Sequence, residues 1–263
     1  MVRAITEIYG VKNVTELRNK IDDILSVLRN SYNGQKNPPQ IQKLKGMIRE
    51  FEEELVWAHF GFQVKNVHHL RLGFYTGDIF TEQPERDRDV TPILEQLREL
   101  RPSVISLAFD PEGSGPDTHY KVLQAIAEAV RLWEKEEDLS NLRIWGYRNV
   151  WFRFHAAEAN VIVPVSLNAM AVMDNSFTNC YLSQVDASFP SYMLDGKFSE
   201  LAKNIWVDQL KDVQLILGKD YFYQNESPRI RTTHGLLFFK EMSVKEFLEH
   251  ARELEKTMEG VVS

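Results

Sequence analysis

The chain of 263 residues is long enough for one large α/β domain or two small domains. Hydrophobic residues make up 43% and charged residues 26%, a composition typical of globular proteins that excludes a disordered chain, a collagen and a disulfide scaffold. The formal net charge of −7 and the lack of a basic stripe argue against a nucleic-acid-binding protein.

Cysteine content and hydropathy indicate the compartment. Cys180 is the single cysteine, so neither an intrachain disulfide nor a cysteine-rich metal site can form. No apolar run reaches the ~20 residues that a membrane helix needs, and the N-terminus lacks the layout of a signal peptide. We therefore expect a cytoplasmic protein without a membrane partner.

The first sixty residues predict helices. In the first of them, an apolar face (Leu17, Ile21, Ile24, Leu25 and Leu28) follows Asn13 or Thr15 as a cap. After Pro38-Pro39, a second helix that ends at Gly61 places apolar residues inward (Ile41, Leu44, Ile48, Phe51 and Leu55). An acidic run lies largely on its other side (Glu50, Glu52, Glu53 and Glu54), and we interpret this run as a solvated face.

An α/β pattern follows, with strands predicted at 67–72, 104–109, 142–147 and 160–165. The apolar run at 104–109 is typical of a strand that is covered on both faces. Helices are predicted at 90–100 and 118–133, the second one capped by Thr118 or Asp117. The alternation of strand, polar loop and helix predicts a Rossmann-like, mostly parallel sheet with helices on both faces.

The remaining residues predict a helix at 198–210, a short edge strand at 236–239 and a tail helix. Ser243 and Glu246 would form a capping box at the start of the tail helix. No linker or repeat interrupts the chain, so we predict a single domain over residues 1–263. Its parts are a helical N-terminal part (1–61), an α/β core (62–217) and a C-terminal loop and helix (218–263).

The loop after the strand at 104–109 could carry chemistry, because ligands of open α/β sheets bind at the carboxyl ends of the strands. This loop holds Asp110, Glu112, Asp117 and His119. Imidazole and carboxylate groups suit Zn²⁺ or a similar divalent ion, and Asp117 and His119 could both point back toward the strand end. The alternative is that Asp117 is an ordinary helix cap and Asp110-Pro111 an ordinary turn.

Three consecutive segments, residues 67–75, 110–119 and 145–151, resemble segments of the LmbE/PIG-L family of zinc-dependent deacetylases, which act on N-acetylglucosamine-type groups. Residues 44–49 with Glu52 resemble the form of that domain joined behind a glucosamine-6-phosphate deaminase domain. The likeness covers roughly residues 40 to 215. It implies a Rossmann-like fold, a zinc cofactor and an amino-sugar substrate.

The resemblance also has gaps. The His-Pro-Asp-Asp motif, which supplies two zinc ligands and the general base at the end of the family's first strand, is absent. We expect that strand to lie before Met1. His119 matches the remaining zinc ligand, and Pro116 replaces a histidine that the family usually has. Asp117 would orient His119 or the substrate, and Arg148 and Arg49 would bind substrate.

Several hypotheses follow from the resemblance and its gaps. The first is metal-dependent hydrolysis of an amide, incomplete in this chain. The alternative is a non-catalytic sugar-binding, regulatory or oligomerisation module that keeps only the fold. Arg148 could instead form a salt bridge, and Arg49 could pair with Glu52. A sheet without its first strand has an exposed edge, which implies a homo-oligomer, an upstream domain or a partner chain.

Overall fold

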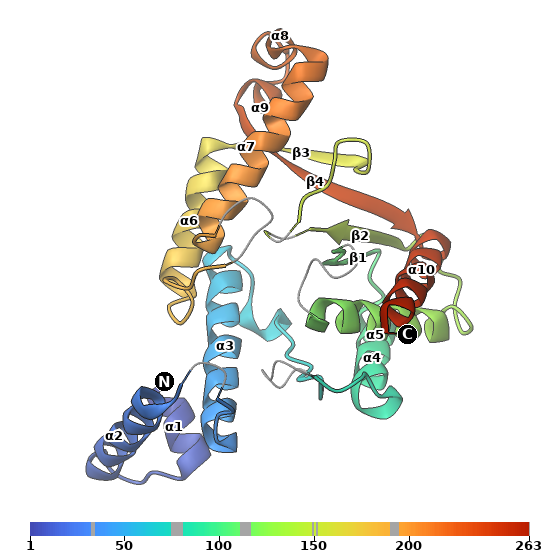
Figure 1. The fold of residues 1–263 in the computed structure, drawn as a ribbon. Coiled ribbons are helices and arrows are strands. Elements are labelled where there is room, and N and C mark those ends of the chain that lie inside the picture. Colours follow the sequence, from blue (N-terminus) through green and yellow to red (C-terminus); the bar gives the residue numbers. More distant parts are fainter. Residues whose placement is uncertain are drawn as a thin grey trace. The chain divides into compact units, whose positions relative to one another are not determined.

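The computed structural model describes residues 1–32, 35–74, 81–110, 117–148, 150, 152–189 and 195–262 (Figure 1). The chain divides into two compact units. The first contains Met1–Arg71 and Ser176–Gln184, and the second contains Leu72–Phe74, Glu82–Asn175 and Val185–Ser263. Within the described ranges, no helix combines the length and the apolar character needed to cross a membrane.

The first unit is helical. Its elements are α1 (Val2–Tyr9), α2 (Val14–Asn30), α3 (Pro39–His59) and a short 3-10 turn, η1 (Val64–Asn66). Asn13 caps α2 as predicted, because its Oδ1 accepts a hydrogen bond from the Glu16 amide at 2.9 Å. The apolar stripes of the three helices meet in a small core (Ala4, Ile5, Ile24, Ile41 and Leu44).

The second half of α3 buries a different side from the one predicted. Phe51 and Leu55 are 55% and 39% exposed, whereas Glu52 is only 4% exposed. The Glu52 carboxylate accepts hydrogen bonds from the Ser183 amide at 2.7 Å and from the Ser183 hydroxyl at 2.6 Å. Because these bonds satisfy the buried charge, the helix can bury its acidic side there. The prediction of a solvated acidic face is therefore wrong at Glu52.

The second unit is built on a sheet whose described strands are β1 (Val104–Ala108), β2 (Arg143–Tyr147), β3 (Val161–Ser166) and β4 (Thr233–Ser243). Their order in the sheet is β1-β2-β4-β3. β1 and β2 pair in parallel, whereas β4 is antiparallel to both β2 and β3. The α/β class is thus confirmed, but the sheet is mixed, and the predicted parallel pairing is found between β1 and β2.

The mixed character comes from the C-terminal segment. Instead of a short edge strand at 236–239, the chain forms the 11-residue strand β4 between β2 and β3. Leu236, Phe238 and Met242 alternate along it and are each 3% exposed or less. This buried apolar face holds β4 inside the sheet rather than at its edge.

Residues 67–72 do not form the predicted strand. Arg71 has a φ of 52°, outside the range of extended backbone. Its guanidinium donates hydrogen bonds to both carboxylate oxygens of Glu50, at 2.6 and 2.9 Å. The segment is therefore tied to α3 through this ion pair.

The second unit also contains the helices that precede, connect and follow its strands. They are η2 (Arg86–Val90, a π-helix), α4 (Thr91–Leu100), α5 (Asp117–Trp133), α6 (Leu167–Cys180, of which the last residues belong to the first unit), α7 (Phe198–Leu217), α8 (Lys219–Tyr223), α9 (Pro228–Arg231) and α10 (Val244–Val262). Helices α4, α5 and α10 lie together near β1 and β2 (Figure 1). Ser243 and Glu246 form the predicted capping box of α10, with the Ser243 amide 2.8 Å from the Glu246 carboxylate.

β1 is covered on one face only. Leu107 is 4% exposed and packs with residues of α4, α5 and α10 in the main core. Val104, which points to the other face, is 42% exposed, and Ser106 is exposed as well. The prediction of a strand covered on both faces is therefore wrong for β1 as far as the described residues go.

Phe109, directly after β1, packs against the main core and also against a second core. The second core lies between α7, α8 and β4 (Phe154, Leu210, Val213, Phe222, Leu236 and Phe238). Gly146 of β2 allows this position, because an added Cβ there would lie 2.7 Å from the Phe109 Cβ. The end of β1 is thus held in place by packing from two sides.

Candidate functional site

Asp110 and His119 meet at the carboxyl end of β1. The Phe109 amide donates to the Tyr147 carbonyl at 2.7 Å, which extends the β1–β2 pairing by one residue. Asp110 follows directly, and its Oδ2 lies 2.6 Å from Nδ1 of His119. The strand therefore positions the carboxylate, and the first turn of α5 positions the imidazole.

The Asp110 carboxylate is buried, and only one of its two oxygens has a hydrogen-bond partner among the described residues. Its side chain is 5% exposed, and its Oδ1 has no hydrogen-bond partner among the described residues. A buried carboxylate oxygen without a donor is unfavourable. This position therefore favours a ligand that brings an N–H group, an O–H group or a cation.

Contact with Asp110 also sets the chemistry of His119. When the carboxylate accepts the Nδ1–H of a histidine, Nε2 is the basic nitrogen of the neutral ring. The His119 side chain is 22% exposed, so solutes can reach it. An imidazole held in this way is a polar side chain with which a ligand can form hydrogen bonds.

The partner of Asp117 is different. Its Oδ2 lies 2.6 Å from Nζ of Lys121, whose side chain is only 4% exposed. Asp117 therefore balances a buried cation, and the carboxylate in contact with Nδ1 of His119 is that of Asp110. The sequence signal for Asp110 is its place directly after an apolar strand, but an ordinary turn explains an Asp-Pro pair at this position equally well. Glu112 and Pro116 lie outside the described residues.

The donor set does not make a complete catalytic zinc site. Such a site needs about three protein ligands and an open position for water. Within the described ranges, no group of three or more histidine, cysteine, aspartate or glutamate side chains could hold a metal ion. His119 and Asp110 supply two donors, so the described residues do not fit catalytic zinc.

Arg148, directly after β2, lies in a dense set of contacts. Its side chain is 8% exposed, and its two Nη atoms each lie 3.1 Å from the Glu158 carboxylate. Its Nε donates to the Phe109 carbonyl at 3.3 Å, and its guanidinium lies 4.2 Å from the centroid of the Phe154 ring. The salt bridge that the sequence left open for Arg148 is therefore present, and Arg148 ties the end of β2 to the end of β1.

Glu158 is the anionic partner of this arginine. Burial raises the pKa of Glu158, but hydrogen bonds from the His155 amide and from Arg148 outweigh it, and the pKa lies below its ordinary value. Glu158 is therefore ionised at neutral pH and balances the charge of Arg148.

Arg49 is exposed on α3 in the first unit. The alternative partner that the sequence suggested, Glu52, accepts its hydrogen bonds from Ser183. The neighbouring Glu53 accepts one from the Tyr181 hydroxyl. Burial and this hydrogen bond raise the pKa of Tyr181. The acidic side of α3 therefore binds the segment 181–183. Arg49 is exposed at the surface of the helix.

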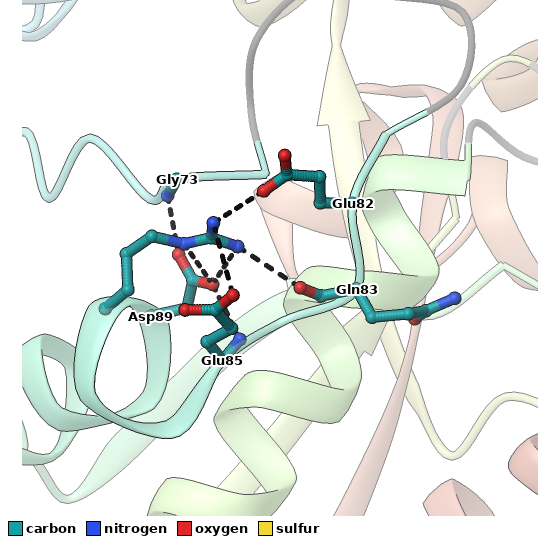
Figure 2. A network of polar contacts seen from close by, with 6 residues as sticks. Gly73, Glu82, Gln83, Glu85 and Asp89 are labelled. Carbon is teal, nitrogen blue, oxygen red and sulfur yellow. Dashed lines mark hydrogen bonds and ion pairs between the residues drawn. The ribbon is translucent and has the colours of Figure 1, made fainter.

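A second buried carboxylate, Asp89, organises the polar network in Figure 2. Its side chain is 0% exposed and accepts hydrogen bonds from the Gly73 amide (2.5 Å), the Glu85 amide (2.8 Å) and the Arg88 guanidinium (2.9 Å). Glu82 contacts Arg88 at 2.6 Å. Burial raises the pKa of Asp89, but these hydrogen bonds outweigh it and lower the pKa. The network joins Gly73 to the π-helix η2.

The described fold and site define an α/β protein with a carboxylate–imidazole pair at the end of a sheet strand. No family model and no solved structure matches the chain. The chain is 28% identical over 193 residues to a protein of Bacteroides thetaiotaomicron that bears the name "Putative glucosamine-6-phosphate deaminase-like protein". The match covers 71% of this chain but spans only 28% of the length of that relative.

Proposed function

We propose that this chain is a deacetylase-like α/β module that binds an N-acetylated amino sugar or its phosphate at the carboxyl ends of β1 and β2. The observation that carries the proposal is the Asp110–His119 pair, with a buried Asp110 oxygen that lacks a donor. The name of the distant relative and the resemblance of residues 67–75, 110–119 and 145–151 support amino sugars as the ligand class.

The chemistry of the pair suits a sugar. Hydroxyl and acetamido groups supply the O–H and N–H donors that the free Asp110 oxygen needs. The imidazole of His119 adds a polar group beside this oxygen, because its Nδ1 lies 2.6 Å from the Asp110 Oδ2. In a Rossmann-like arrangement, which we propose for this α/β fold, such ligands bind at the strand ends.

Two functions are possible for such a module: metal-dependent deacetylation of the bound sugar, or sugar binding without catalysis. Two observations favour sugar binding without catalysis. The described residues supply two candidate metal donors where about three are needed. Arg148, expected from the resemblance to hold substrate, is occupied by Glu158 and by the Phe109 carbonyl. Release of acetate separates the two candidates.

Substitution of His119 tests the site. We expect the chain to bind N-acetylglucosamine 6-phosphate, and His119→Ala to weaken binding about tenfold or more, because one oriented hydrogen-bonding group is lost. Isothermal titration measures the affinity, and detection of the free amine measures deacetylation. The exposed His59 provides a matched control as His59→Ala, which should bind like the parent chain. Equal affinity of His119→Ala and the parent, or no binding by the parent, would contradict the proposal.

Zinc retention is a separate prediction. With two donors, a bound ion exchanges readily, so we expect well under one zinc per chain after equilibration with zinc and desalting. Metal analysis by mass spectrometry against protein concentration measures the ratio. One zinc per chain would instead mean that residues outside the described ranges complete a site, and a drop in that ratio in His119→Ala would place His119 in it.

A further inference from the structure

The C-terminal end of α7 carries apolar side chains beyond the core of its own unit. Val213 is the last residue of α7 that is buried, at 9% exposure. The next turn presents Leu215, Ile216 and Leu217, which are 85%, 72% and 50% exposed. Ile216 and Leu217 lie three and four residues after Val213 and so continue the buried stripe of the helix into solvent.

Helix α8 adds two aromatic side chains to this surface. Gly218, with a φ of 82°, turns the chain between α7 and α8. Phe222 packs into the second core, whereas Tyr221 and Tyr223 on either side of it are 48% and 60% exposed. Leu215, Ile216, Leu217, Tyr221 and Tyr223 together form what we call the α7–α8 patch; Figure 1 shows α8 beyond the end of the sheet strands of its unit.

The backbone beneath the patch is hydrogen-bonded in a regular way. The Gly218 amide donates to the Gln214 carbonyl at 3.0 Å, and the Gln224 amide donates to the Asp220 carbonyl at 2.9 Å. The Tyr221 ring packs edge-on against the Phe222 ring, with centroids 5.2 Å apart. The apolar groups are therefore held at the surface by ordered helices rather than by a frayed end.

The area of the patch reaches what a protein contact needs. Five large apolar side chains at these exposures present roughly 500 Å², at the upper end of what single proteins leave open to water. Two such patches face to face would bury about 1,000 Å², the lower limit for a specific interface.

The charges around the patch point to its partner. Beside the patch, Lys211 is paired with Asp208 at 2.9 Å, whereas Lys219 and Asp220 are both exposed and balance each other in charge. A balanced rim does not select an acidic or a basic partner, and it lacks the excess of lysine and arginine typical of membrane-surface helices. In a twofold contact of identical surfaces, however, the exposed Lys219 of one copy can meet the exposed Asp220 of the other.

We propose that the α7–α8 patch is the contact surface between two copies of this chain, related by a twofold axis. Leu215 and Ile216 lie at the centre of the contact, and the two tyrosines and the balanced charges surround them. This association is independent of the sugar site at the end of β1.

Substitution of Leu215 tests the interface in solution. We expect the full chain to dimerise, and Leu215→Glu to weaken dimerisation by about tenfold or more, as for other central apolar contacts. Sedimentation equilibrium measures the dissociation constant. Leu100→Glu is the matched control, because Leu100 lies in the same unit and is 59% exposed but is outside the patch. Since Leu215 is 85% exposed, the thermal unfolding of Leu215→Glu should match that of the parent chain.

Oxidative cross-linking tests whether Leu215 and Ile216 lie near the twofold axis of the proposed dimer. Cys180 is the only native cysteine and is buried, so it should not interfere. Near the twofold axis, Leu215→Cys or Ile216→Cys should form a disulfide-linked dimer under mild oxidation, whereas Leu100→Cys should not. A parent chain that stays monomeric at high concentration would overturn the proposal. A dimer unaffected by Leu215→Glu would also overturn it, because the contact would then lie on another surface.

Discussion

Asp89→Asn should lower the free energy of unfolding of the second unit by about 3–5 kcal/mol, the usual cost of breaking a buried ion pair from one side. The carboxylate is fully buried and accepts hydrogen bonds from two backbone amides and from Arg88. An amide side chain presents N–H groups to some of these donors, so two donors would face each other. Chemical denaturation of the parent and the variant measures the difference.

The same carboxylate makes stability depend on pH. The pKa of Asp89 is lower in the folded chain than its ordinary value of about 3.9. The stabilisation is therefore complete above that ordinary value and is lost as the pH falls through the folded pKa. We expect the unfolding free energy of the parent to fall below about pH 4, and this fall to be smaller in Asp89→Asn.

Asp87 supplies the control for both measurements. It lies on the same π-helix, two residues before Asp89, and is exposed. Asp87→Asn should keep both the stability and the acid sensitivity of the parent chain. A similar loss in Asp87→Asn and Asp89→Asn would show that charge on η2, rather than the buried network, stabilises the segment.

Local features of the fold could be predicted from the sequence. The Asn13 cap of α2 and the Ser243–Glu246 box of α10 involve residues three positions apart, and both are present. β1, β2 and β3 could also be predicted, since each is a short apolar run between turn residues. The long central strand β4 could not, because its place depends on pairing with β2 and β3 and not on its own pattern.

The buried polar contacts could not be predicted, because their partners are distant in the sequence. Glu52 meets Ser183 across 131 positions, and this contact reverses the buried side of α3. Asp110 lies nine positions before His119, on the other side of the loop. The residue type and place of His119 make it a candidate from the sequence, but the contact of its Nδ1 with Asp110 could be identified only from the structure.

Arg148→Ala should destabilise the second unit by about 2–4 kcal/mol, because it removes charged hydrogen bonds and the stacking on Phe154 in a buried place. The side chain is 8% exposed and joins Glu158 to the Phe109 carbonyl at the end of β1. Arg148→Lys should recover little of the loss, because an ammonium group cannot make the paired contacts of the guanidinium. Denaturant unfolding measures each variant.

An exposed salt bridge of the same kind shows how much of the expected stability loss is due to burial. Arg98 also makes two hydrogen bonds to one glutamate, Glu136 at 2.9 and 2.5 Å, but both side chains are more than 40% exposed. Arg98→Ala should therefore lose far less stability than Arg148→Ala. If Arg148 were only a ligand-binding residue, Arg148→Ala would keep the stability of the parent and lose sugar affinity alone. Because the guanidinium connects the ends of β1 and β2, we expect the variant to lose stability first and to weaken the Asp110–His119 site through it.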